Sequence, residues 1–112
     1  MDFREKTFAG EAHKRLSFLT DQFGFAEPHV ERGASPGTAV AVRYRRRDIV
    51  IEVSLVFWYM GEEYVATTQC VDLPDGAARR TEVARNTAHT GYQMRRALKL
   101  QAEVVRASMH AL

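Results

Sequence analysis

The sequence predicts an α+β fold: an N-terminal helix, an antiparallel meander of three to four strands, and a long C-terminal helix that could be kinked. Three observations predict it. Apolar residues recur every three or four positions near the N-terminus, alternate through the middle of the chain, and return to helical spacing after Pro74. The 112 residues are a usual length for one folded unit, so we expect residues 1–112 to form a single domain.

The N-terminal helix is indicated by apolar residues at helical spacing on one face: Phe8, Ala12, Leu16, Leu19 and Phe23. Gly24 follows at once, at the position where a left-handed residue commonly ends a helix. Phe25 would then fold back on Leu19. We therefore interpret the FGF sequence as a helix stop and not as a platform for stacking bases.

The strands of the meander are predicted from alternating apolar and polar residues, with turns between them. The expected strands are an edge element at residues 29–32, then residues 40–45, 49–60 and 64–71. The turns between the last three fall at residues 46–48 and 61–63, and LPDG ends the sheet at residues 73–76.

The C-terminal helix is expected to begin after Asp75, which we interpret as its N-cap, and to run to the end of the chain. Its apolar stripe consists of Gly91, Met94, Leu98, Ala102 (or Gln101), Val105, Met109 and Leu112. Thr90 and Gly91 lower helix propensity and allow a kink or a break there.

The strand at residues 49–60 has two different faces. Its odd positions are all apolar, namely Ile51, Val53, Leu55, Phe57 and Tyr59, and we expect the helices to cover them. The even positions begin with Glu52 and Ser54 and then become apolar at Val56, Trp58 and Met60. These three residues are the predicted partner-binding patch, for a foreign protein or a second copy in a homodimer. The alternative is that a terminal segment of the chain buries them.

A basic cluster lies at the other end of the same hairpin and consists of Arg43, Arg45, Arg46 and Arg47. Arginine pairs with carboxylates and with phosphates, so the cluster could meet an acidic protein or a nucleic acid. Equally, charged side chains on a solvent-facing strand keep a sheet edge soluble. The arginines and lysine after residue 78 are spread around the predicted helix, which is typical of a solvated face.

The sequence gives no support for a cofactor, a metal site or a membrane span. The histidines lack the spacing of a zinc site, Cys70 is the single cysteine, and the longest apolar run, residues 55–60, is too short to cross a membrane. No catalytic motif is present. An enzyme would need a pocket that joins two or more of His13, His29, His89, Glu62 and Glu63. The charged N-terminus and lone cysteine indicate a cytoplasmic protein.

The order of helix, meander and helix, with FGF closing the first helix, resembles a diffuse group of small bacterial proteins over about residues 5–75. That group includes immunity proteins of polymorphic toxin systems. The resemblance implies a cytoplasmic inhibitor that covers the active site of a cognate toxin, and it carries over no site residues. Double-stranded RNA-binding domains share the element order, but their compact lysine cluster is absent here.

We therefore predict a non-catalytic protein-binding module that acts through Val56, Trp58, Met60 and the arginines at 43 and 45–47. The alternative is a nucleic-acid-binding protein that uses Arg43 to Arg47 and the basic C-terminal helix.

Overall fold

The computed structural model describes residues 3–33, 35–58 and 61–110 and confirms the α+β prediction. The elements in chain order are α1 (Phe3–Arg15), α2 (Ser17–Phe23), β1 (His29–Arg32), β2 (Thr38–Arg46), β3 (Ile49–Phe57), β4 (Glu63–Asp72), β5 (Ala78–Thr87) and α3 (Gly91–His110). The sheet has five strands, one more than the upper bound of the prediction.

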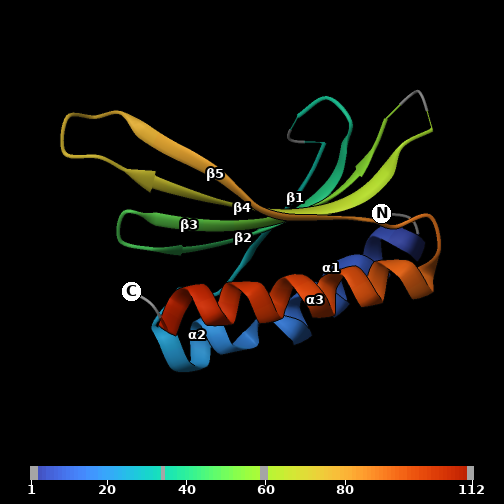
Figure 1. Cartoon of the computed structure of the whole chain (residues 1–112), viewed down its shortest axis with the longest axis horizontal. Coiled ribbons are helices and arrows are strands. Elements are labelled where there is room, and N and C mark those ends of the chain that lie inside the picture. Colours follow the sequence, from blue (N-terminus) through green and yellow to red (C-terminus); the bar gives the residue numbers. More distant parts are fainter. Residues whose placement is uncertain (1–2, 34, 59–60, 111–112) are drawn as a thin grey trace.

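The strands form one antiparallel meander in the order β1-β2-β3-β4-β5, so each strand pairs with its neighbour in the chain. Figure 1 shows the described helices together on one side of this twisted sheet, with α1 and α3 side by side. We call that side of the sheet the inner face and the opposite side the outer face. The molecule thus has two layers, with its core between the inner face and the helices.

The core confirms the predicted alternation in β3. Ile51, Val53 and Leu55 point inward and are at most 1% exposed. They pack in one cluster with Phe8 and Ala12 of α1 and with the apolar stripe of α3. The predicted α3 stripe is correct at Met94, Leu98, Gln101, Ala102, Val105 and Met109, all of which are buried. Leu112 and Tyr59 lie outside the described residues.

The N-terminal helix is divided at Leu16, where one continuous helix was predicted. Leu16 has φ −106° and ψ 10°, and α2 begins at the next residue. Leu16 is nevertheless buried, so the apolar face continues across the break, and apolar spacing alone could not reveal it. The predicted stop is confirmed: Gly24 has φ 75°, and the amide of Phe25 donates to the carbonyl of Leu19 at 2.9 Å.

The prediction of a helix from Asp75 onward is wrong for residues 78–87, which form β5. Asp75 is a turn residue, since its Oδ1 accepts the amide of Ala77 at 3.0 Å, and Gly76 adopts φ 87°. The alanines and arginines of this segment favour a helix, but pairing along β4, from Asp72 opposite Ala78 to Tyr64 opposite Thr87, determines its conformation.

The HTG sequence at residues 89–91 therefore separates a strand from a helix and is not a kink within a helix. Thr90 accepts the amide of Gln93 through Oγ1 at 3.1 Å, and the Gln93 side chain accepts the amide of His89 at 2.8 Å. This reciprocal arrangement is close to a capping box, whose sequence pattern of threonine followed three residues later by glutamine is present. Over the described residues, no helix has the length and apolar character that crossing a membrane requires.

Candidate functional site

The outer face of the sheet is hollowed, with a volume of about 440 Å³. Its floor consists of small or short side chains from β3 and β4: Ser54, Val56, Ala66 and Thr68. Trp58, Tyr64 and the loop at residues 35–38 stand at one end, and charged side chains of β5 and β3 stand along the side, namely Arg80, Glu82, Arg85 and Glu52. The hollow combines an aromatic end with a charged wall.

Trp58 is held in place by two contacts of its indole. One side lies against Gly37, where a Cβ atom would be only 3.1 Å from the ring, and Gly37 also adopts φ 83°. Any other residue at position 37 would therefore strain the backbone and displace the indole. The indole Nε1 donates to Tyr64 Oη at 3.0 Å. Trp58 remains 37% exposed, so its ring is positioned but not enclosed.

The other two apolar residues of the predicted patch contribute differently. Val56 points to the outer face, as predicted, but is only 6% exposed and forms part of the floor of the hollow. Met60 lies outside the described residues. Of the three, Trp58 is therefore the one that offers contact area at the rim, and Tyr64 is its aromatic neighbour. The guanidinium of Arg85 lies 4.0 Å from the centre of the Tyr64 ring.

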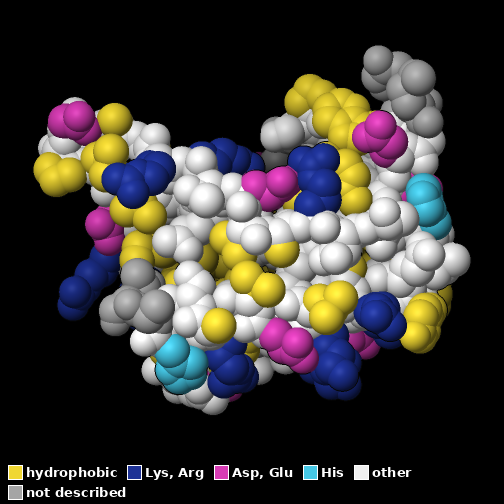
Figure 2. Space-filling model, viewed as in Figure 1, with side chains coloured by type: hydrophobic (Ala, Val, Ile, Leu, Met, Phe, Trp, Pro, Cys, Tyr) yellow, Lys and Arg dark blue, Asp and Glu magenta, His cyan; other side chains and the backbone are white. Residues whose placement is uncertain are grey.

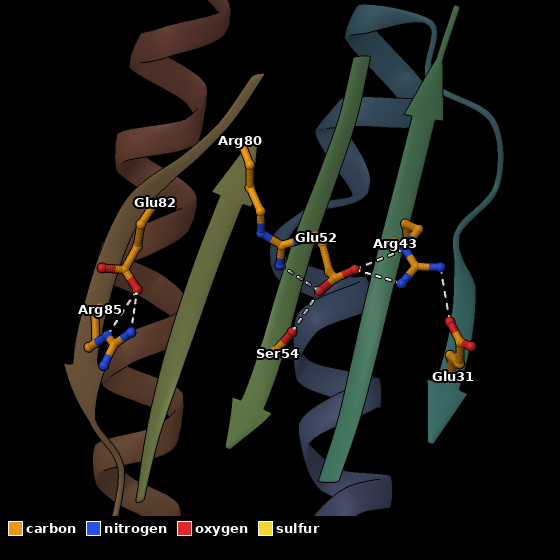
Figure 3. A network of polar contacts seen from close by, with 7 residues as sticks. All are labelled: Glu31, Arg43, Glu52, Ser54, Arg80, Glu82 and Arg85. Carbon is orange, nitrogen blue, oxygen red and sulfur yellow. Dashed lines mark hydrogen bonds and ion pairs between the residues drawn. The ribbon is translucent and has the colours of Figure 1, made fainter. Parts of the chain in front are cut away.

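The charged wall is a network of ion pairs across neighbouring strands (Figure 3). Glu52 accepts from Arg43 Nη2 at 2.7 Å and from Arg43 Nε at 2.9 Å, and Ser54 donates to its other oxygen at 3.2 Å. Arg43 also donates to Glu31 at 2.9 Å, and Arg80 lies 3.7 Å from Glu52. The hydrogen bond to Glu52 is the main cause that raises the pKa of Arg43 above its usual value. The network keeps the charges of the wall largely paired.

The arginines of the β2–β3 hairpin do not form one positive ridge. Arg43 and Arg45 point to the outer face, where Arg45 lies 3.7 Å from Asp72. Arg46 points the other way, donates to the carbonyl of Phe23 at 2.7 Å, and lies over the ring of Phe25. Arg47 occupies the turn with φ 52° and is exposed. The hairpin thus distributes its positive charges over two faces.

A second polar cluster lies where β4 and the start of α3 meet the N-terminal helix. Glu63 accepts from Arg4 at 3.0 Å and lies 3.2 Å from Nδ1 of His89. Glu62, Glu63 and His89 also line an adjoining hollow of about 310 Å³, a grouping that an enzyme would need. However, the His89 side chain is 51% exposed, and the Glu63 carboxylate is occupied by Arg4, which makes it a weak base. We interpret the cluster as a structural contact that links α1, β4 and the start of α3.

The stability that this cluster gives the protein depends on pH, and this dependence can be measured. The hydrogen bond from Arg4 is the main cause that lowers the pKa of Glu63. The contribution of the Arg4–Glu63 hydrogen bond to stability is therefore complete above about pH 4.3, the ordinary pKa of a glutamate, and is lost as pH falls below that value. We expect Glu63→Gln to reduce the drop in melting temperature that the wild type shows on acidification. Glu62→Gln, which removes the same charge next to it, should keep the wild-type drop.

Comparison with known protein families, with curated proteins and with solved structures found no match for this chain. Among the described residues, no group of three or more His, Cys, Asp or Glu side chains could hold a metal ion.

Several residues of the hollow were missed at the sequence level: Gly37, Tyr64, Arg80, Glu82 and Arg85. Arg80, Glu82 and Arg85 were placed on a helix, where they would have been distant from Trp58. The available signal was the PDG sequence at 74–76, a strong turn pattern between two runs that can pair as strands. A turn at these residues predicts that β5 pairs with β4 and that the charged side chains of β5 lie on the outer face.

Proposed function

We propose that the chain is a non-catalytic protein-binding module that takes a partner protein on the outer face of its sheet. The observation that carries this proposal is the position of Trp58, an aromatic side chain fixed by Gly37 and Tyr64 and left 37% exposed at the rim of a hollow. A preorganised tryptophan loses little entropy on binding, and such residues dominate the energy of protein interfaces. The described helices all lie on the inner face, so none of them covers the outer face, where a partner can bind (Figure 1).

The charges around Trp58 favour a protein partner over a nucleic acid. Acidic and basic side chains alternate along the wall, and the pairs Arg43–Glu52 and Arg85–Glu82 are formed within the chain at 2.7 Å. A phosphate backbone would require an excess of free positive charge. A protein surface with its own mixed charges can exchange pairs with this wall, which gives specificity and orientation.

The nucleic-acid alternative keeps Arg45, Arg47 and the exposed basic residues of α3 as its binding groups. It has a simple test, because backbone binding weakens steeply as salt is added. Binding of a generic duplex at low salt, lost at high salt, would support this alternative. Absence of binding at low salt would remove it.

The narrower form of the proposal is a bacterial immunity protein that neutralises a cognate toxin in the cytoplasm. It is supported by the similarity in element order to such proteins, and the single Cys70 fits a reducing compartment. A toxin-like reading frame directly upstream of the gene would supply the partner. Co-expression of that toxin domain with this chain should restore growth and yield a stable complex. Failure to protect would remove the toxin reading while leaving a binding module.

The role of Trp58 can be tested with that encoded neighbour as the probe. We expect Trp58→Ala to weaken the complex by about 2 kcal/mol, since it removes the central aromatic contact, while leaving the melting temperature nearly unchanged. Binding can be followed by calorimetry and folding by circular dichroism. Phe3→Ala is the control, because Phe3 is an aromatic side chain on α1 that is 85% exposed and remote from the outer face. Unchanged affinity in Trp58→Ala would contradict the proposed surface.

A further inference from the structure

One flank of α3 carries an apolar stripe that the core covers only in part. Ala97, Leu100, Val104 and Ala107 follow one another at steps of three, four and three, the spacing of a helix that packs against another helix. Ala97 is buried against the molecule, but Leu100 is 39% exposed and Val104 is 44% exposed. The stripe shares Ala97 with the buried face of α3, and Leu100 and Val104 extend that apolar surface beyond the core.

This flank lies beside the free edge of the sheet. The hollow between α3 and β5 is lined by Asn86 and Thr87 on the strand and by Ala97 and Leu100 on the helix. β5 is ten residues long and forms the edge of the sheet on this side. Long edge strands are commonly covered, because their unpaired backbone groups invite association. The pairing of β5 with β4 shifts register between Thr67 and Thr68, and such a bulge bends the edge strand, which favours a contact carried mainly by the helix.

Figure 2 shows this side of the molecule. Several groups of hydrophobic side chains lie across its middle, separated by other uncharged surface, and many charged side chains lie above and below them. An uncharged centre with a charged border is the usual composition of a protein interface. The surface is distinct from the hollow on the outer face, which faces away from the helices.

We propose that this α3 flank binds a second copy of the chain, with the two α3 helices packed antiparallel about a two-fold axis near Leu100. The charges beside the stripe identify the occupant. Arg96 and Glu103 lie seven positions apart on the solvent side of the stripe, on either side of Leu100. In an antiparallel pair centred there, Arg96 of each copy lies opposite Glu103 of the other, so the surface is complementary to itself. A parallel pair would place this flank of the two copies on opposite sides of the contact, so Arg96 would not meet Glu103.

The same arrangement fits the apolar side chains. Leu100 meets Leu100 of the second copy at the axis, and Val104 flanks that contact on each side of it. The edge strands of the two copies then lie next to each other above the helix pair, which shields both.

The state of association in solution tests this proposal. We expect the purified chain to sediment as a dimer that dissociates on dilution, and Leu100→Glu to weaken self-association at least about tenfold. Lys99→Glu, on the exposed side of α3 away from the stripe, is the matched control and should leave the dimer intact. Circular dichroism confirms folding, since Leu100 and Lys99 are both solvent-accessible. A wild-type chain that is monomeric at all concentrations overturns the proposal.

A charge exchange tests the antiparallel arrangement itself. Arg96→Glu alone and Glu103→Arg alone should each weaken the dimer, because each places like charges opposite one another. The double variant Arg96→Glu with Glu103→Arg should restore it. Dimerisation that is insensitive to these changes would overturn the arrangement. Trp58→Ala should leave the dimer unchanged, so failure of the outer-face proposal and failure of this one give different results.

Discussion

Replacing Gln101 with leucine is expected to lower the free energy of unfolding by about 3 kcal/mol, one of the largest effects that a near-isosteric change can have in this protein. Gln101 is 1% exposed and lies between α3 and the inner face of the sheet. Its Oε1 accepts from Thr67 Oγ1 at 2.6 Å, and its Nε2 donates to the carbonyl of Val65 at 2.7 Å and to Asn86 Oδ1 at 3.0 Å. One amide thus joins α3 to both β4 and β5.

The cost comes from the partners that remain. Leucine fills nearly the same space, so little cavity forms, but the Thr67 hydroxyl and the Val65 carbonyl lose their partner in a buried place. Each unsatisfied buried group costs about 1–3 kcal/mol. Lys99→Leu, a change at an exposed position of the same helix, should alter stability by no more than about 0.5 kcal/mol.

Urea unfolding of the double variant Gln101→Leu with Thr67→Val gives the decisive comparison. Removing the hydroxyl together with the amide leaves fewer unpaired groups, so the double variant should be less destabilised than the sum of the two single variants. Strict additivity would mean that the 2.6 Å contact between these side chains contributes nothing to stability.

The sequence predicted the parts of the fold in which one period dominates. Apolar alternation predicted a strand at residues 49–60, of which Ile49–Phe57 forms β3, and helical spacing identified the buried face of α3, because in both cases burial follows directly from the period. The stop at Gly24 was also predicted correctly, because only a left-handed residue allows that end of the helix and glycine adopts it freely. These features depend on residues that are close together in the sequence, so local sequence patterns are enough to predict them.

The residues of β5 carry no strand pattern of their own, so only the turn at residues 74–76 pointed to this strand, and its conformation depends on its neighbour. Residues 78–87 are mostly exposed and polar on both faces, so they lack the alternation of a half-buried strand, and alanine and arginine suggested a helix instead. Hydrogen bonding along β4 supplies what the segment lacks. The error moved Arg80, Glu82 and Arg85 away from the outer face, so the charged wall was not foreseen.

The arginine cluster illustrates a different limit. Four arginines in five positions indicate a strong positive patch as long as their partners are unknown. The fold brings Glu31 and Glu52 to Arg43 from neighbouring strands and brings the carbonyl of Phe23 to Arg46. A count of charged residues along the sequence therefore overestimates the unpaired positive charge at the surface.

The difference between the two faces of β3 yields the second large effect. Leu55→Ala should lower the free energy of unfolding by about 3 kcal/mol, because Leu55 is fully buried between Val40 and Val65, which pair with it on the neighbouring strands and are themselves 0% exposed. A cavity in that position cannot be refilled without moving the strands or the helices. Chemical denaturation monitored by circular dichroism measures the loss.

Ser54→Ala is the matched change on the opposite face of the same strand. The Ser54 hydroxyl donates to Glu52 at 3.2 Å beside the hollow, and its removal should cost no more than about 1 kcal/mol. Similar losses in the two variants would mean that the outer face is also a packed interior, and the proposed partner surface would then fail. A large loss in Leu55→Ala with a small loss in Ser54→Ala means that β3 stabilises the fold through its odd positions. Exposed positions of the outer face can then change for recognition at little cost to folding, whereas Gly37, which packs against Trp58, cannot.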